Sequence, residues 1–212
     1  MRVLVGAALA AVVMMLWGAV YWVVLWGPGA PMKPLPDEGR WMEQMRGGEG
    51  GSALPGGAYL FPFQPAKVDG HSEAMKTYLQ REMQGPLGML FIRPAGRTAM
   101  GGDTLLLGLA HFFVSALMAA ILLRMVMSVL TGYLGRVFFV FLLGVFAALT
   151  VRLSDPIWWN LPWDFFVHGA VMTVINWLLA GLVLAMIVKP QQGFVHETDP
   201  NRPLWKRALD VD

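Results

Sequence analysis

Residues 165–188, FFVHGAVMTVINWLLAGLVLAMIV, contain no Asp, Glu, Lys or Arg and are long enough to cross a bilayer as one helix. Lys189 and Pro190 close this run. Three further apolar runs have a comparable length. They are Val3–Trp26, Thr104–Leu123 with an extension toward Leu130, and Tyr133–Leu153. The four runs predict an all-α integral membrane protein with about four transmembrane helices.

The composition agrees with a membrane location. Hydrophobic residues make up 56% of the 212 residues and charged residues 14%, against about 25% charged in typical soluble domains. The chain has no Cys, which excludes disulfides, thiolate zinc sites, iron–sulfur clusters and a Cys nucleophile. The net charge is only +2 and the basic residues are scattered, so nothing favours a nucleic-acid partner.

The runs divide the chain into four parts. Residues 1–27 form an anchor helix, which we expect to remain uncleaved because its apolar stretch exceeds that of a signal peptide. Residues 28–102 form an extracytoplasmic segment, 103–189 a three-helix transmembrane bundle and 190–212 a cytoplasmic tail.

Lys and Arg in the short flanks set the expected orientation, because such residues are retained in the cytoplasm. Placing both termini inside puts only Arg152 in a short outer loop. The Gly- and Ala-rich composition is compatible with a bacterial-type inner membrane. The residues that would then be cytoplasmic are Arg2, Arg124, Arg136, Lys189, Arg202, Lys206 and Arg207.

The segment 28–102 is rich in Gly and Pro and predicts a small mixed α+β unit. Asp37 is expected to cap a helix that reaches Arg46, and Ser72 to cap a helix that reaches Gln84. Tyr59–Phe63 and Met89–Ile92 read as short strands. A unit this small has a thin core, so its apolar helix faces should contact a partner. The expected contact residues are Trp41, Met45, Tyr78 and Leu79.

Two histidines lie inside the predicted spans. His111 and His168 fall at similar depths, with Gly108 and Gly169 beside them. Two imidazoles from facing helices are able to hold haem b, and one is able to ligate the magnesium of a (bacterio)chlorophyll. The preferred interpretation is that both are hydrogen-bonded within the bundle and that the protein carries no cofactor.

Other residues in the spans indicate helix packing. Asn176 lies near the middle of its span and is expected to hydrogen-bond across helices, with Ser115 as a candidate partner. Gly144 and Gly181 each precede an Ala by four residues, a spacing that allows close helix contact. No carboxylate lies deep in any span, which argues against an ion-coupled transporter.

Motifs of known catalytic classes and of strong metal sites are missing from the sequence. The clusters His196–Asp199 and His71 with Glu73 match no metal-ligand spacing and are expected to be solvated. We therefore expect a non-catalytic accessory or structural subunit that binds other membrane protein subunits. The alternative is a haem- or (bacterio)chlorophyll-binding subunit of an electron-transfer or photosynthetic complex that uses His111 and His168.

Overall fold

The computed structural model describes residues 1–25, 32–48, 51–65, 70–98 and 100–189. The chain is mostly helical. Four helices in the described residues are long and apolar enough to cross a membrane, as the sequence predicted. They span Arg2–Leu25, Gly102–Met125, Tyr133–Trp158 and Trp163–Ile187. The expected tail at 190–212, including the cluster His196–Asp199, lies outside the described residues.

Two of the four spans change helix type toward one end. The first consists of α1 (Arg2–Ala19) and the π-helix η1 (Val20–Leu25). The third consists of α5 (Tyr133–Ala147), the π-helix η2 (Ala148–Arg152) and α6 (Ser154–Trp158). The second and fourth are the single helices α4 (Gly102–Met125) and α7 (Trp163–Ile187).

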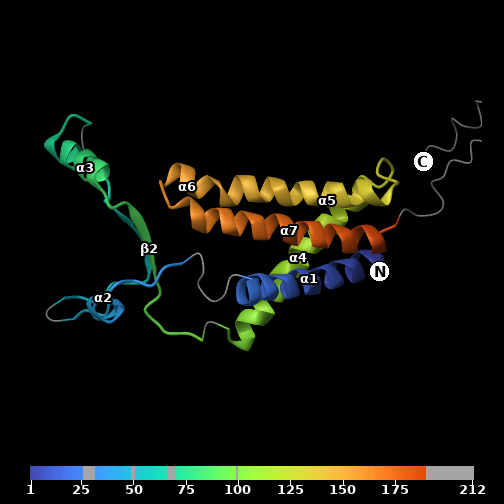
Figure 1. Cartoon of the computed structure of the whole chain (residues 1–212), viewed down its shortest axis with the longest axis horizontal. Coiled ribbons are helices and arrows are strands. Elements are labelled where there is room, and N and C mark those ends of the chain that lie inside the picture. The colour runs from blue at the N-terminus through green and yellow to red at the C-terminus, as the bar shows by residue number, and fades with distance from the viewer. Residues whose placement is uncertain (26–31, 49–50, 66–69, 99, 190–212) are drawn as a thin grey trace, which may run out of the picture.

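The four spans form a bundle in which α1 packs against α4 and α7, and α5 packs against α7. Helix α4 crosses the bundle obliquely, so its last turns meet α5 (Figure 1). The start of α1, the end of α7 and the connection between α4 and α5 share one end of the bundle (Figure 1). The connection between α6 and α7 lies at the opposite end.

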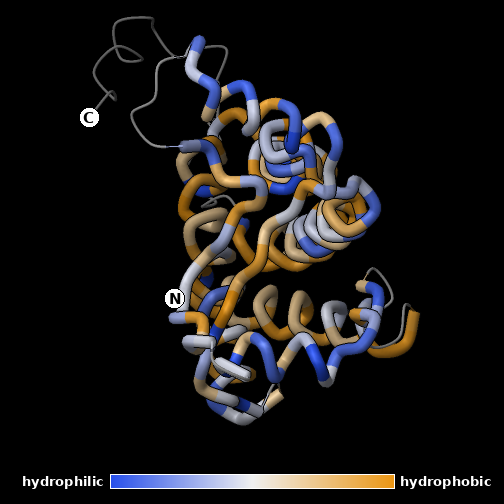
Figure 2. Tube along the Cα trace, turned by 90° about the vertical axis from the view of Figure 1, so that its left-hand side faces the viewer, coloured by the Kyte–Doolittle hydropathy of each residue, from blue (hydrophilic) through white to orange (hydrophobic). Residues whose placement is uncertain are grey.

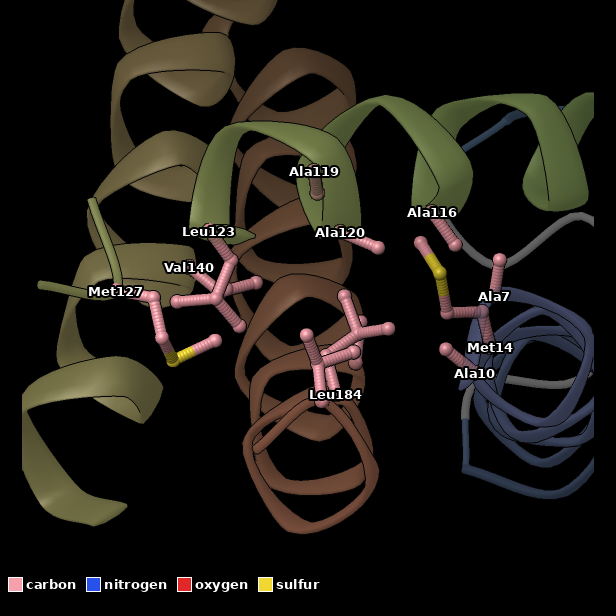
Figure 3. Packing of buried hydrophobic residues seen from close by; sticks show 12 residues of the cluster. Ala7, Ala10, Met14, Ala116, Ala119, Ala120, Leu123, Met127, Val140 and Leu184 are labelled. Atoms are coloured by element: carbon pink, nitrogen blue, oxygen red, sulfur yellow. The ribbon is translucent and has the colours of Figure 1, made fainter. Parts of the chain in front are cut away.

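Small side chains allow these helices to approach closely. Figure 3 shows Ala7, Ala10 and Met14 of α1 opposite Ala116 and Ala120 of α4. Lipid tails are as apolar as the helix surfaces, so helices in a membrane gain more from close packing than from hiding large apolar groups. Many of the larger apolar residues accordingly lie outside, as expected for contact with a bilayer. Exposed examples are Leu4, Leu16, Leu106, Phe146 and Met186.

The described residues 32–48, 51–65 and 70–98, here called the connecting segment, lie beyond the end of the bundle that carries α6 (Figure 1). The segment contains α2 (Glu38–Met45), β1 (Gly57–Phe61), α3 (Glu73–Gln84) and β2 (Gly88–Ile92). The two strands pair in antiparallel register, with Tyr59 opposite Leu90. Hydrophobic and hydrophilic residues alternate along the part of the chain that faces the viewer in Figure 2.

Local signals in the connecting segment were read with mixed success. Ser72 caps α3 as predicted, since its Oγ accepts a hydrogen bond from the Met75 backbone N–H at 3.2 Å. Asp37 is the N-cap residue of α2, as predicted, but it adopts a left-handed conformation and its side chain makes no capping hydrogen bond. The first strand ends at Phe61 rather than Phe63, since Pro62 has no N–H to donate.

Candidate functional site

A pocket of about 620 Å³ lies between the connecting segment and the α6–α7 end of the bundle. One wall is the β1–β2 hairpin and α3, and the other is the turn that follows α6. The pocket therefore brings together residues that are about 70 to 100 positions apart in the sequence. Its volume is in the range of small-molecule binding sites. The lining residues include Tyr59, Phe61, Tyr78, Glu82, Trp158, Trp159 and Asn160.

Helix α3 places a tyrosine and a carboxylate side by side on the pocket wall. Tyr78 and Glu82 are one turn apart, and the Tyr78 hydroxyl donates a hydrogen bond to Glu82 Oε1 at 3.1 Å. Desolvation of the partly buried phenol raises the pKa of Tyr78, and the hydrogen bond and negative charge of Glu82 raise it further. Among the described residues that line the pocket, Glu82 is the one that carries a charge.

The other wall is aromatic. Trp158 ends α6 and Trp159 follows it, and both indole rings are exposed. Asn160 has a φ of 51°, a left-handed conformation that Asn tolerates better than most residues, and it turns the chain toward α7. On the hairpin side, the Tyr59 hydroxyl is held by the Pro55 carbonyl at 2.7 Å.

The connecting segment also carries an apolar surface that no other described part of the chain covers. None of its described residues is buried. Met83 on α3 is 90% exposed and Phe91 on β2 is 76% exposed. Of the predicted contact residues, Trp41 and Leu79 are exposed, whereas Met45 and Tyr78 are partly buried. Tyr78, which was predicted to contact a partner protein, also lines the pocket, and no feature of the sequence indicated that position.

The two membrane histidines lie on helices that share no extended interface, since α4 packs on α1 and α5 while α7 packs on α1 and α5. His111 is exposed on α4, and its ring lies 5.4 Å from that of Phe112. His168 Nδ1 lies 2.7 Å from the Asp164 carbonyl oxygen one turn earlier. The side chain of Arg152 fills the space beside Gly169, where a flat cofactor would need to approach. The paired-histidine cofactor stays a prediction without support from this geometry.

The predicted packing glycines both lie between α5 and α7. A Cβ built on Gly144 would lie 2.2 Å from the Trp177 Cβ, and one built on Gly181 would lie 3.0 Å from the Val137 carbonyl oxygen. At each of these two positions, a residue larger than glycine would fit only if the neighbouring helix moved.

Asn176 is only 4% exposed, so it faces the bundle interior, but its Oδ1 has no hydrogen-bond partner among the described residues. Ser115 is not that partner. Its hydroxyl donates to the His111 carbonyl at 2.9 Å, the bond to the preceding turn that Ser often makes inside helices.

Arg136 is buried at the start of α5, at the end of the bundle opposite the pocket. Its Nη1 donates to the Thr131 carbonyl at 2.9 Å, so the side chain turns back toward the beginning of its own helix. A long Arg side chain that turns this way carries its charge toward the end of the helix while its aliphatic stem stays in the bundle. Nearby, the Tyr133 hydroxyl donates to the Leu182 carbonyl at 3.2 Å and ties α5 to α7.

Comparison with protein-family models, with curated proteins and with solved structures finds no match to the chain. Within the described residues no group of three or more His, Asp or Glu side chains is arranged to hold a metal ion.

Sequence reasoning missed the pocket. Nothing in the sequence was a reason to assign Glu82 a role. The spacing of Tyr78 and Glu82 was a readable signal that the two share a helix face. Their meeting with residues 158–160 was not readable, because it depends on how the connecting segment lies against the bundle.

Proposed function

We propose that this protein is a non-catalytic accessory subunit of a larger membrane protein complex, and that the connecting segment is its main contact surface. The observation that carries the proposal is that no described residue of the segment is buried, although the segment exposes Trp41, Phe63, Met83 and Phe91. Exposed apolar area costs about 25 cal/mol per Å². A surface of this kind favours a partner that covers it.

The occupant we propose is a surface of another membrane protein rather than the lipid. The connecting segment extends past the end of the bundle, away from the apolar surfaces of the four spans (Figure 1). Its charges also include both signs, as in the ion pair between Lys76 and Glu73, instead of the basic face that binds anionic lipid. Aromatic and Met side chains are enriched where proteins contact one another.

The proposal includes a bacterial-type inner membrane with both termini in the cytoplasm and the connecting segment outside. Arg2, Arg136 and Lys189 lie at the end of the bundle opposite Trp158 and Trp159, which supports this direction through the retention of basic flanks inside. A reporter that is active only in the periplasm should be active when fused after Gly96 and inactive when fused after Lys189. The reverse pattern would overturn the orientation.

The test of the proposal replaces the two most exposed apolar side chains of the two elements that flank the pocket. Met83→Ser with Phe91→Ser should reduce the mass of the complex extracted in mild detergent from its native membrane toward that of the 23.4 kDa chain. Membrane insertion should not change, because it depends on the spans. The matched control is Gln80→Ser with Arg93→Ser, which alters an exposed polar residue of α3 and the exposed residue that directly follows β2.

Two differently tagged copies expressed together separate a hetero-complex from self-association. If the complex contains another protein, the mass of the extracted complex should exceed that of the chain although one tag does not co-purify the other. A wild-type chain that is extracted as a monomer, or a double variant that assembles like the control, would contradict it.

A further inference from the structure

The pocket between α3, the hairpin and the α6–α7 turn has the chemistry of a cation site. Aromatic residues from both walls line it, among them Tyr59, Tyr78, Trp158 and Trp159. The faces of such rings carry negative electrostatic potential and attract a positive group within about 6 Å of the ring centre. Glu82 adds a carboxylate, and among the described residues that line the pocket there is no Lys, Arg or His to neutralise it.

The Glu82 carboxylate is oriented by a hydrogen bond but has no cationic partner among the described residues. Its Oε1 accepts the hydrogen bond from the Tyr78 hydroxyl, which fixes the side chain against α3. Glu82 forms neither an ion pair nor a second hydrogen bond with the residues that the structure describes. By comparison, Glu73 on the same helix pairs with Lys76 at 2.7 Å. Glu82 thus has the unmatched negative charge that a bound cation would balance.

The size of the pocket favours a small organic cation over a bare metal ion. A volume of about 620 Å³ lies within the roughly 300–1,000 Å³ of small-molecule sites. Hard metal ions need several oxygen ligands, whereas the lining supplies one carboxylate and mainly aromatic and aliphatic carbon. Rings around a single charge suit a weakly hydrated ammonium group instead.

We propose that this pocket binds an organic cation, an ammonium group whose alkyl substituents lie against the rings of Trp158, Trp159 and Tyr78 and whose charge is balanced by Glu82. The chemistry is shared by a free quaternary amine and by the headgroup of a choline lipid, which the nearby end of the bundle would reach. The proposal does not depend on the accessory-subunit function, because the pocket is formed within the single chain.

The test compares choline with its uncharged analogue of the same shape, 3,3-dimethylbutanol, on the full chain in maltoside micelles by isothermal titration calorimetry. Choline should bind about ten-fold more tightly or better, because only it gains the cation–π and carboxylate attraction. Glu82→Gln keeps an oxygen that accepts the Tyr78 hydrogen bond, yet it should lose about ten-fold in choline affinity. Glu73→Gln removes an equal charge from the same helix outside the pocket and should change nothing.

A second pair of variants checks the aromatic wall. Trp159→Leu should weaken choline binding several-fold, whereas Trp163→Leu, an exposed Trp outside the lining, should not. Repeating the titration in phosphatidylcholine nanodiscs distinguishes the sources. Weaker binding of added choline there identifies the lipid headgroup as the occupant, and equal binding identifies a free cation. Equal affinity for choline and its neutral analogue, or full affinity in both Glu82→Gln and Trp159→Leu, would overturn the proposal.

Discussion

The helix bundle closes its own interior, whereas the connecting segment does not. The buried cluster of the bundle contains residues from all four spans, and many of them are alanines. The connecting segment has defined helices and paired strands, but every described residue in it remains at least partly accessible. The difference indicates that side-chain packing holds the bundle together, while local backbone hydrogen bonds and caps hold the segment. Changes to packing and changes to caps should therefore affect the two regions differently.

The largest effect is expected where two helices of the bundle touch most closely. Gly144→Ala would put a Cβ 2.2 Å from that of Trp177, so α5 and α7 must separate. Overpacking of this kind costs about 3 kcal/mol of unfolding free energy. Gly108→Ala is the control, since nothing lies within 4 Å of its Cβ position, and it should be neutral or slightly stabilising. Unfolding by SDS in mixed micelles measures both. Equal stability of the two variants would mean that close contact does not hold the bundle.

A buried amide gives a second way to examine the bundle interior. Asn176 Oδ1 is buried and has no hydrogen-bond partner in the part of the chain that the structure describes, and an unsatisfied group of this type costs about 1–3 kcal/mol. Asn176→Leu should therefore raise the unfolding free energy by about 1 kcal/mol in the same SDS titration. Thr173→Val, which removes a hydroxyl bonded to the Gly169 carbonyl within the helix, should change it by less than about 0.5 kcal/mol. Destabilisation by Asn176→Leu would instead indicate a partner for that oxygen.

The sequence predicted the bundle far better than the segment's position, for a physical reason. Long uncharged runs have few ways to satisfy their backbone in lipid, so runs such as 165–188 specify a helix nearly on their own. The cap at Ser72 was equally local and equally readable. The partner of Asn176 and the neighbours of Tyr78 depend on which elements meet. Apolar helix surfaces have little directional preference for a partner, so the sequence pattern does not show which elements will pack together.

A cap variant tests the other half of the comparison. Ser72→Ala removes the acceptor for the Met75 N–H and should destabilise α3 by about 1 kcal/mol. Hydrogen exchange of the α3 amides should accelerate about five-fold, while exchange in α1 and α7 should not change. Ser52→Ala, an exposed loop position in the same segment, is the matched control. If Ser72→Ala also accelerated exchange in the bundle, the two regions would not be independent.

The smallest expected effect is a titration within the pocket. Burial first, and then Glu82, raise the pKa of Tyr78 above the ordinary value of 10.0, because both disfavour the phenolate. The stabilising contribution of the neutral phenol is therefore complete below about pH 10 and is lost as the pH rises through the raised value. Glu82→Gln should lower the pKa of Tyr78 only in part, since desolvation remains. NMR of ring-labelled tyrosine, with Tyr78→Phe to assign the signal, measures the midpoint. If Glu82→Gln leaves the titration midpoint of Tyr78 unchanged, the Glu82 carboxylate does not face the phenol. The negative charge that we propose for this wall of the pocket would then lie elsewhere.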